Sequence, residues 1–164
     1  KDTGNLSRVY WIFPAGHFAG LPTLLTDTKH LYSMSAFAGT SVCQTDINVV
    51  RDIFRENGYF AYNLIEKANK TLTEFHLKGI LDRKHGNAMA KLADTLLFLA
   101  DNVFLSHQFD LLLTRVELAQ LTNISRENTI KALSAFHREG IIRLNGRIVE
   151  IIKREELEKT VRYG

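Results

Sequence analysis

The fold is decided by one stretch, LTRVELAQLTNISRENTIKALSAFHREGIIRLNGRIVEI, residues 113–151. Thr114, with a glutamate three residues later, forms a capping box that predicts the start of a first short helix. Asn123 lies in a predicted tight turn, and Ser125 is the expected N-cap of a second helix. Gly140 suits the position just after that helix ends. Two short capped helices joined by a tight turn are typical of a helix-turn-helix.

A predicted β-hairpin follows at residues 141–152, IIRLNGRIVEII. The dipeptide Asn145-Gly146 suits a two-residue type I′ turn, because both central positions of that turn need positive φ. A helix-turn-helix followed by such a hairpin is a winged helix. Arg143 and Arg147 flank the predicted tip, and we expect them to meet phosphates if the hairpin approaches a nucleic acid.

The second predicted helix has two different faces. Arg126, Glu127 and, one turn further on, Lys131 lie on one face. The other face is expected to enter the core with three apolar residues, Ile124, Ile130 and Leu133. A face with this charge pattern either reads base edges in a major groove or is a solvated helix surface, where Glu127 only complements the helix dipole.

Upstream, residues 59–84 show a helical pattern without proline. Its apolar positions recur at spacings of four and three and form a narrow seam of Phe60, Leu64, Ala68, Leu72 and Phe75. A narrow seam suits a second copy of the same helix, and the alternative is packing on the chain's own sheet. Asn87 is the expected N-cap of a further helix at residues 88–102, and a domain boundary is placed there. Residues 103–112 are predicted to be extended.

The N-terminal part of the chain reads as a piece of an antiparallel sheet. Residues 6–13 and 31–47 are rich in β-branched and aromatic residues, and the second range is expected to form two short strands divided near Gly39. Residues 47–56 are predicted to form a short helix with Asp46 as its N-cap. These strands are too few to close a barrel or a sandwich by themselves.

Composition gives weaker constraints. The chain has 164 residues, is 45% hydrophobic and 24% charged, and contains no apolar run long enough to cross a membrane. Lys and Arg are frequent between residues 126 and 162, which favours contact with a phosphate backbone. The first residues include neither an initiating methionine nor an apolar leader, and they read as the start of a fragment.

Candidate reactive groups are few. Cys43 is the single cysteine, which excludes an internal disulfide and a four-cysteine iron–sulfur site, and a reducing compartment is expected. We expect Cys43 to be a small core residue, and a reactive thiol or a haem ligand is the alternative. The six histidines show no metal-ligand spacing, and neither a nucleophile–base pair nor a phosphate-binding loop is present in the sequence. No cofactor, metal site or enzymatic activity is therefore expected.

The stretch quoted above resembles the DNA-binding module of the Crp/Fnr family of bacterial transcription regulators. Thr-Arg-x-Glu-Leu-Ala, Ser-Arg-Glu, Glu-Gly-Ile-Ile and a glycine-tipped wing all match the family pattern. The resemblance is strong over residues 88–152 and weak over residues 1–57. It implies an α+β fold with three parts: the end of a cyclic-nucleotide-binding-like β-roll (residues 1–57), a dimerisation helix and hinge (58–86) and a winged helix-turn-helix (87–164).

The resemblance implies a cytoplasmic homodimer that reads an inverted repeat in double-stranded DNA, with RNA polymerase as a further partner. Arg126 could then form two hydrogen bonds with guanine, Glu127 could accept from cytosine, and Lys131 could reach a guanine or a phosphate. The full set of expected DNA-binding residues is Thr114, Ser125, Arg126, Glu127, Asn128, Lys131, Arg143, Asn145 and Arg147. A winged-helix module that binds protein instead of DNA is the alternative, although such a surface would favour aromatic residues and Met.

The family's cyclic-nucleotide binders use a Glu in a glycine-rich turn and an Arg-Ser pair. This chain has Leu21 at the Glu position, Leu31 or Tyr32 at the Arg position, and Ser33 at the Ser position. Without the carboxylate and the guanidinium, cyclic AMP is not expected to bind, and the effector stays unknown. An effector pocket would be lined by Phe18, Gly20, Leu21, Tyr32 and Ser33.

Overall fold

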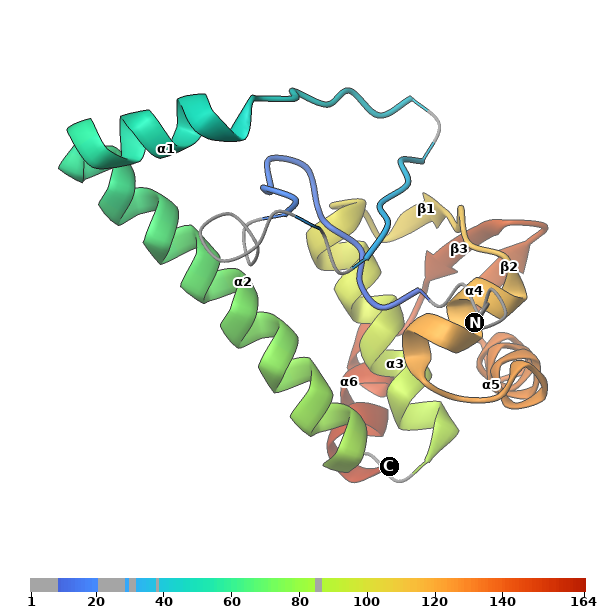
Figure 1. Cartoon of the computed structure of the whole chain (residues 1–164). Helices are drawn as coiled ribbons and strands as arrows, with labels where there is room; N and C mark the ends of the chain where they lie inside the picture. The colour runs from blue at the N-terminus through green and yellow to red at the C-terminus, as the bar shows by residue number, and fades with distance from the viewer. Residues whose placement is uncertain (1–8, 21–28, 30–31, 38, 85–86) are drawn as a thin grey trace, which may run out of the picture. The chain divides into compact units, whose positions relative to one another are not determined.

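The computed structural model describes residues 9–20, 29, 32–37, 39–84 and 87–164, with the side chains of residues 74–84 excepted. The chain divides into two compact units. One unit comprises Gly79–Gly164 together with the N-terminal segment up to Ala15, and the other comprises Gly16–Lys78. Figure 1 shows the elements of both. The three-part domain division expected from the sequence stays a prediction.

The first unit is organised around helix α3 (Ala88–Phe98), which continues as a π-helical turn, η2 (Leu99–Val103). The side chain of Asn87 accepts a hydrogen bond of 2.8 Å from the backbone N–H of Ala90, so the predicted N-cap is confirmed. Leu92 and Leu96 are fully buried on this helix. Trp11 packs on Phe98 with ring centroids 5.2 Å apart, which brings the N-terminal segment against α3.

Helices α4 (Arg115–Thr122) and α5 (Arg126–Arg138) form the predicted helix-turn-helix. Thr114 and Glu117 form a complete capping box at the start of α4. Asn123 ends α4 in the left-handed conformation, with φ of 53°, which turns the chain sharply toward α5. Gly140 follows α5 with φ of 66°, as its expected position after the helix requires. The local signals for both helices are therefore confirmed.

The wing is a three-stranded antiparallel sheet in the order β1-β3-β2. Its strands are β1 (Gln108–Asp110), β2 (Ile142–Asn145) and β3 (Ile148–Ile151). Phe109 and Val149 pair across β1 and β3 and are buried, whereas their neighbours Gln108 and Asp110 are exposed. Of the extended segment expected at residues 103–112, only Gln108–Asp110 forms a strand, and Val103 belongs to the π-helical turn.

The hairpin turn differs from the prediction by one residue. Asn145 pairs with Ile148, so Gly146 and Arg147 are the two central residues of the turn. Gly146 has φ of 60°, and neither Asn145 nor Arg147 has positive φ. This pattern matches a type II′ turn, with glycine at the first central position, and not the expected type I′ turn on Asn145-Gly146.

Helix α6 (Arg154–Tyr163), which was not predicted from the sequence, is the last element of this unit. Leu157 is fully buried where α6 packs against α3. Leu118 of α4, Phe136 of α5 and Ile142 of β2 are also buried, so one core joins the helices to the wing. Such a core fixes the surface of α5 relative to the hairpin.

The second unit contains α1 (Ile47–Glu56) and the first part of α2 (Gly58–Lys84). The side chain of Asp46 accepts a hydrogen bond of 2.7 Å from the backbone N–H of Asn48, so the predicted helix and cap are confirmed. Asn57 caps α2 by accepting from the backbone N–H of Phe60. The predicted long helix at residues 59–84 is confirmed as α2.

The α+β class is confirmed, but the strands expected near the N-terminus are not. In the described parts of the two ranges, residues 9–13, 32–37 and 39–46, the backbone forms no strand. Residues 6–8, 31 and 38 lie outside the described residues. A strand needs a neighbour for its backbone hydrogen bonds, and propensity alone does not provide one. Cys43, expected in the core of such a strand, is exposed for the same reason.

Candidate nucleic-acid interface

The first turn of α5 fixes which of its faces is exposed. Ser125 caps the helix by accepting a hydrogen bond of 3.1 Å from the backbone N–H of Asn128. The buried hydroxyl of Thr129 donates to the carbonyl of Ser125, which fastens the cap from the inner side. Ala132, Leu133 and Phe136 continue the inner face and are buried. Since one face is committed to the core, the other must project outward.

Arg126, Glu127 and Lys131 are all exposed on that outer face. Among the described residues, the side chains of Arg126 and Lys131 form neither a hydrogen bond nor an ion pair. Hydrogen bonds from its own backbone N–H and from the Ser125 hydroxyl lower the pKa of the Glu127 carboxyl, with smaller contributions from both cations. The structure therefore brings together a free guanidinium, a free ammonium and an ionised carboxylate. Asn128 is exposed beside them.

Ile130 is not where the sequence analysis expected it. Ile124 is half-buried and Leu133 is buried, as expected, but 40% of Ile130 is exposed. Ile130 follows Arg126 by four residues, so it lies on the same side of the helix as the charged residues. The four-residue spacing from Arg126 indicates the outer face, whereas the apolar type of the side chain had suggested the core. An exposed isoleucine here can make an apolar contact with a thymine methyl group.

Thr114 has a structural role at the start of α4. Its hydroxyl oxygen accepts a hydrogen bond of 3.2 Å from the backbone N–H of Glu117, and its own backbone N–H donates to the Glu117 carboxylate at 2.7 Å. Thr114 is exposed, so the hydroxyl can still donate to a further acceptor. The exposed N-termini of α4 and α5 also offer backbone N–H groups and a positive partial charge, which suit phosphates.

The wing arginines differ from the cations of α5 because both are ion-paired. Arg143 pairs with Glu150, directly opposite on β3. Arg147 donates from Nε and Nη2 to the two carboxylate oxygens of Asp110, at 3.0 and 3.2 Å. Asn145 is exposed beside them and lines a shallow hollow on the outer face of the sheet. Sequence gives no local signal for the Arg147–Asp110 pair, whose residues are 37 apart, and the Arg143–Glu150 pair depends on a hairpin register that differs from the predicted one.

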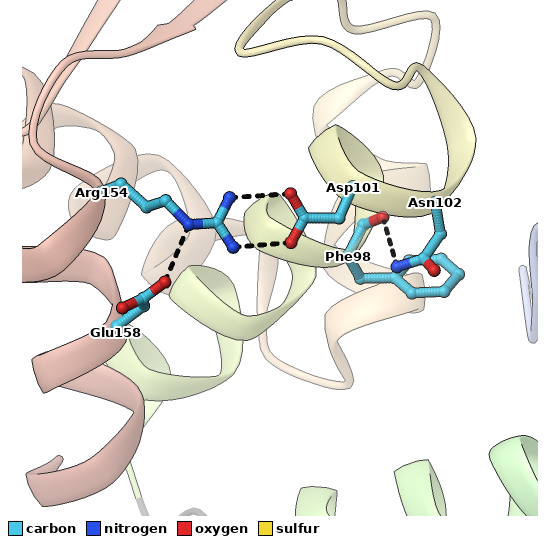
Figure 2. A network of polar contacts seen from close by, with 5 residues as sticks. All are labelled: Phe98, Asp101, Asn102, Arg154 and Glu158. Carbon is cyan, nitrogen blue, oxygen red and sulfur yellow. Dashed lines mark hydrogen bonds and ion pairs between the residues drawn. The ribbon is translucent and has the colours of Figure 1, made fainter.

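A second ion-pair network fastens α6 to the end of α3, as Figure 2 shows. Arg154 donates to both carboxylate oxygens of Asp101 at 2.7 and 2.8 Å, and its Nε donates to Glu158 at 2.8 Å. These hydrogen bonds hold the pKa of Asp101 below its usual value and raise the pKa of Arg154. The network lies on the elements that support the interface, and none of its three residues belongs to α5 or the wing hairpin.

The residues expected around an effector are only partly described. Gly20 is buried, Tyr32 is half-buried, and Phe18 and Ser33 are exposed. Leu21 lies outside the described residues. The ring of Phe18 has the ammonium of Lys67 6.0 Å from its centroid, a cation–π geometry. Within the described part of the chain, no group of three or more His, Cys, Asp or Glu could hold a metal ion, and no helix could cross a membrane.

Comparison with known proteins gives one family. Residues 90–160, which contain α4, α5 and the wing, match the model of the Crp-like helix-turn-helix domain. No curated protein matches the chain by sequence.

Several solved structures share its fold. FixK2 from Bradyrhizobium japonicum superposes with a TM-score of 0.63 at 20% identity, covering 70% of this chain and 58% of FixK2. A CRP-family transcriptional regulator from Thermus thermophilus gives 0.55 at 22% identity, covering 63% and 54%. A CooA variant from Carboxydothermus hydrogenoformans gives 0.58 at 24% identity, covering 71% and 56%. This chain therefore spans little more than half the length of each.

Proposed function

Because residues 90–160 match the model of the Crp-like helix-turn-helix domain, which the sequence also resembles, we propose that this chain is a transcription regulator that binds specific DNA sequences as a homodimer. The observation that carries the proposal is the outer face of α5, where Arg126, Glu127 and Lys131 are exposed and both cations lack a partner among the described residues. A helix with this face fits the width of a major groove.

Each side chain on this face has a matching chemistry in the groove. The Arg126 guanidinium can donate to O6 and N7 of one guanine, and the Glu127 carboxylate can accept from a cytosine amino group. Lys131 can reach a guanine or a phosphate, but its ammonium lacks the planar fork of arginine and discriminates less. Ile130 adds an apolar contact that favours thymine.

Other predicted residues would contact the DNA backbone. Thr114 and Ser125 are at helix N-termini, where hydroxyl and backbone N–H groups favour phosphates. Arg143, Asn145 and Arg147 lie on the wing, which would follow the adjacent backbone. These contacts orient the domain and carry no sequence information of their own.

The homodimer would form through the helix at residues 58–86. Leu64 in the predicted seam is 5% exposed and already covered in the single chain. Tyr62, Ile65 and Leu72 remain exposed, at 66%, 47% and 46%, and their spacings of three and seven place them on one side of α2. A second copy would cover this side. A two-fold dimer would read an inverted repeat, with half-sites about 34–36 Å apart.

The effector stays unassigned. Leu21 and Tyr32 lack the carboxylate and guanidinium that would grip a cyclic nucleotide, so we do not propose cyclic AMP. A cytoplasmic protein that also contacts RNA polymerase fits the proposed role. No catalytic step is part of it.

The proposal is tested by selecting bound duplexes from a random pool with the purified chain. A recovered inverted repeat would support both sequence reading and two-fold symmetry. Recovery of random sequence, with specific capture of a protein in its place, would favour the winged-helix protein-interaction module. Sedimentation of the free chain and of Tyr62→Glu and Ile65→Glu variants would test the dimer separately from DNA.

A further inference from the structure

The wing sheet carries two arginines and two carboxylates, and every one of these charges is paired. Arg147, at the turn, makes two hydrogen bonds with Asp110 on β1, and Arg143 pairs with Glu150. The three strands and the hairpin turn together therefore carry no net charge. Both side chains of the Arg147–Asp110 pair are open to solvent, at 64% and 47% exposure, so the pair is accessible to a phosphate.

Backbone contacts hold Asp110 near the hairpin tip independently of the ion pair. The backbone N–H of Leu111 donates to the carbonyl of Arg147 at 2.9 Å, and Asp110 pairs with Ile148 across the two strands. The carboxylate therefore remains beside the arginine even when a phosphate approaches. Its charge then repels that phosphate, and its oxygens compete for the same N–H groups.

The cations of α5 are not held in ion pairs of this kind. Arg126 and Lys131 form no ion pair among the described residues, whereas both wing arginines do. Sequence-independent affinity for DNA depends on how many phosphates a protein neutralises, while base contacts supply discrimination. An ion-paired wing lowers the sequence-independent affinity and leaves the discrimination between bases intact.

From this arrangement we infer that Asp110 is a specificity-determining residue. It competes with the DNA backbone for Arg147, which keeps the affinity for random sequence low and leaves selection of the site to α5. Glu150 acts on Arg143 in the same way. The inference rests on the proposed DNA-binding function and concerns a residue that would not itself touch a base.

The test compares Asp110→Asn with a matched control, Glu155→Gln. Both remove one carboxylate charge, but Glu155 is exposed on α6 and forms no ion pair among the described residues. Fluorescence anisotropy measures binding to the selected inverted repeat and to a random duplex of equal length across a salt series. Thermal unfolding confirms that each variant is folded.

Asp110→Asn should bind random duplex more tightly than Glu155→Gln does, with a salt slope steeper by about 0.9 for each wing. Over a fourfold fall in salt concentration this corresponds to about a 3.5-fold additional gain in affinity per wing. The ratio of specific to random affinity should fall. In an Arg147→Gln background, Asp110→Asn should lose its advantage over the control, because no arginine is released.

If Asp110→Asn bound random duplex no better than Glu155→Gln, or more weakly than the wild type, the inference would be wrong while the proposed function would stand. A wild-type chain that bound neither duplex would contradict the proposed function itself. The two failures are therefore separate observations in the same titration.

Discussion

Arg154 and Asp101 are separated by 53 residues, yet the guanidinium of the first makes two hydrogen bonds, of 2.7 and 2.8 Å, with the carboxylate of the second. The pair joins the first turn of α6 to the π-helical end of α3, and Glu158 extends it (Figure 2). Both side chains are partly exposed, at 37% and 41%, which moderates the strength of the pair.

The first prediction concerns this pair. Asp101→Asn should lower the free energy of unfolding by about 1 kcal/mol at neutral pH, near the upper end for exposed pairs because the geometry is bidentate. Since folding lowers the pKa of Asp101, its contribution is complete above the unfolded value of 3.8 and is lost as the pH falls through the folded value. Chemical denaturation at neutral and acid pH measures the difference in unfolding free energy between the wild type and the variant. A difference between wild type and variant that persisted unchanged in acid would contradict the assignment.

The second prediction concerns the α6 helix. Leu157→Ala should destabilise the chain by about 2–5 kcal/mol, because Leu157 is fully buried and its removal leaves a cavity against α3. Lys159→Ala, two residues further on at an exposed position, is the control and should cost less than about 1 kcal/mol. Urea denaturation of both variants checks the packing of α6. Equal losses would mean that α6 is not docked as described.

The third prediction separates capping from DNA contact at Thr114. Thr114→Ala should cost about 0.5–2 kcal/mol of stability, because the backbone N–H of Glu117 loses its acceptor. Thr114→Ser keeps the hydroxyl and should restore most of the loss. Thermal unfolding without DNA gives this result directly. If serine failed to restore stability, the hydroxyl would not be the acceptor that fixes the start of α4.

The fourth prediction concerns Ile130. Replacing the contacted thymine by uracil, which lacks the 5-methyl group, should weaken wild-type binding roughly fourfold, since burial of one such group is worth about 0.8 kcal/mol. Ile130→Ser should be insensitive to the same replacement. Anisotropy titrations with single uracil substitutions across the selected site identify the base. Equal sensitivity of wild type and variant at every thymine would exclude the contact.

Sequence could predict those parts of the fold that local chemistry determines. The caps at Asp46, Asn87, Thr114 and Ser125 each depend on a side chain and a backbone N–H two or three residues away, and all four are confirmed. The hairpin was predicted, but its turn is one residue further along the chain. In the sheet, β3 pairs with β1 as well as with β2, and this register is not set by the dipeptide Asn145-Gly146 alone.

Contacts between distant residues could not be predicted in this way. The pairing of Arg147 with Asp110 spans 37 residues and depends on β1 lying beside β3. Neither residue carries a local signal of its partner, so Arg147 was predicted only as a phosphate contact. Ile130 was placed in the core because an apolar residue is assigned there by type, whereas its exposure depends on the angular position of the whole helix.

The most direct test of the central claim is the affinity of Arg126→Ala for the selected inverted repeat and for its single base-pair variants. We expect a loss of about 1–3 kcal/mol, or roughly five- to 150-fold, together with lost discrimination at one base pair of each half-site. Arg138→Ala, an exposed arginine in the last turn of the same helix, should retain the sequence preference of the wild type. Unchanged affinity and unchanged preference in a folded Arg126→Ala variant would show that this face of α5 does not read DNA.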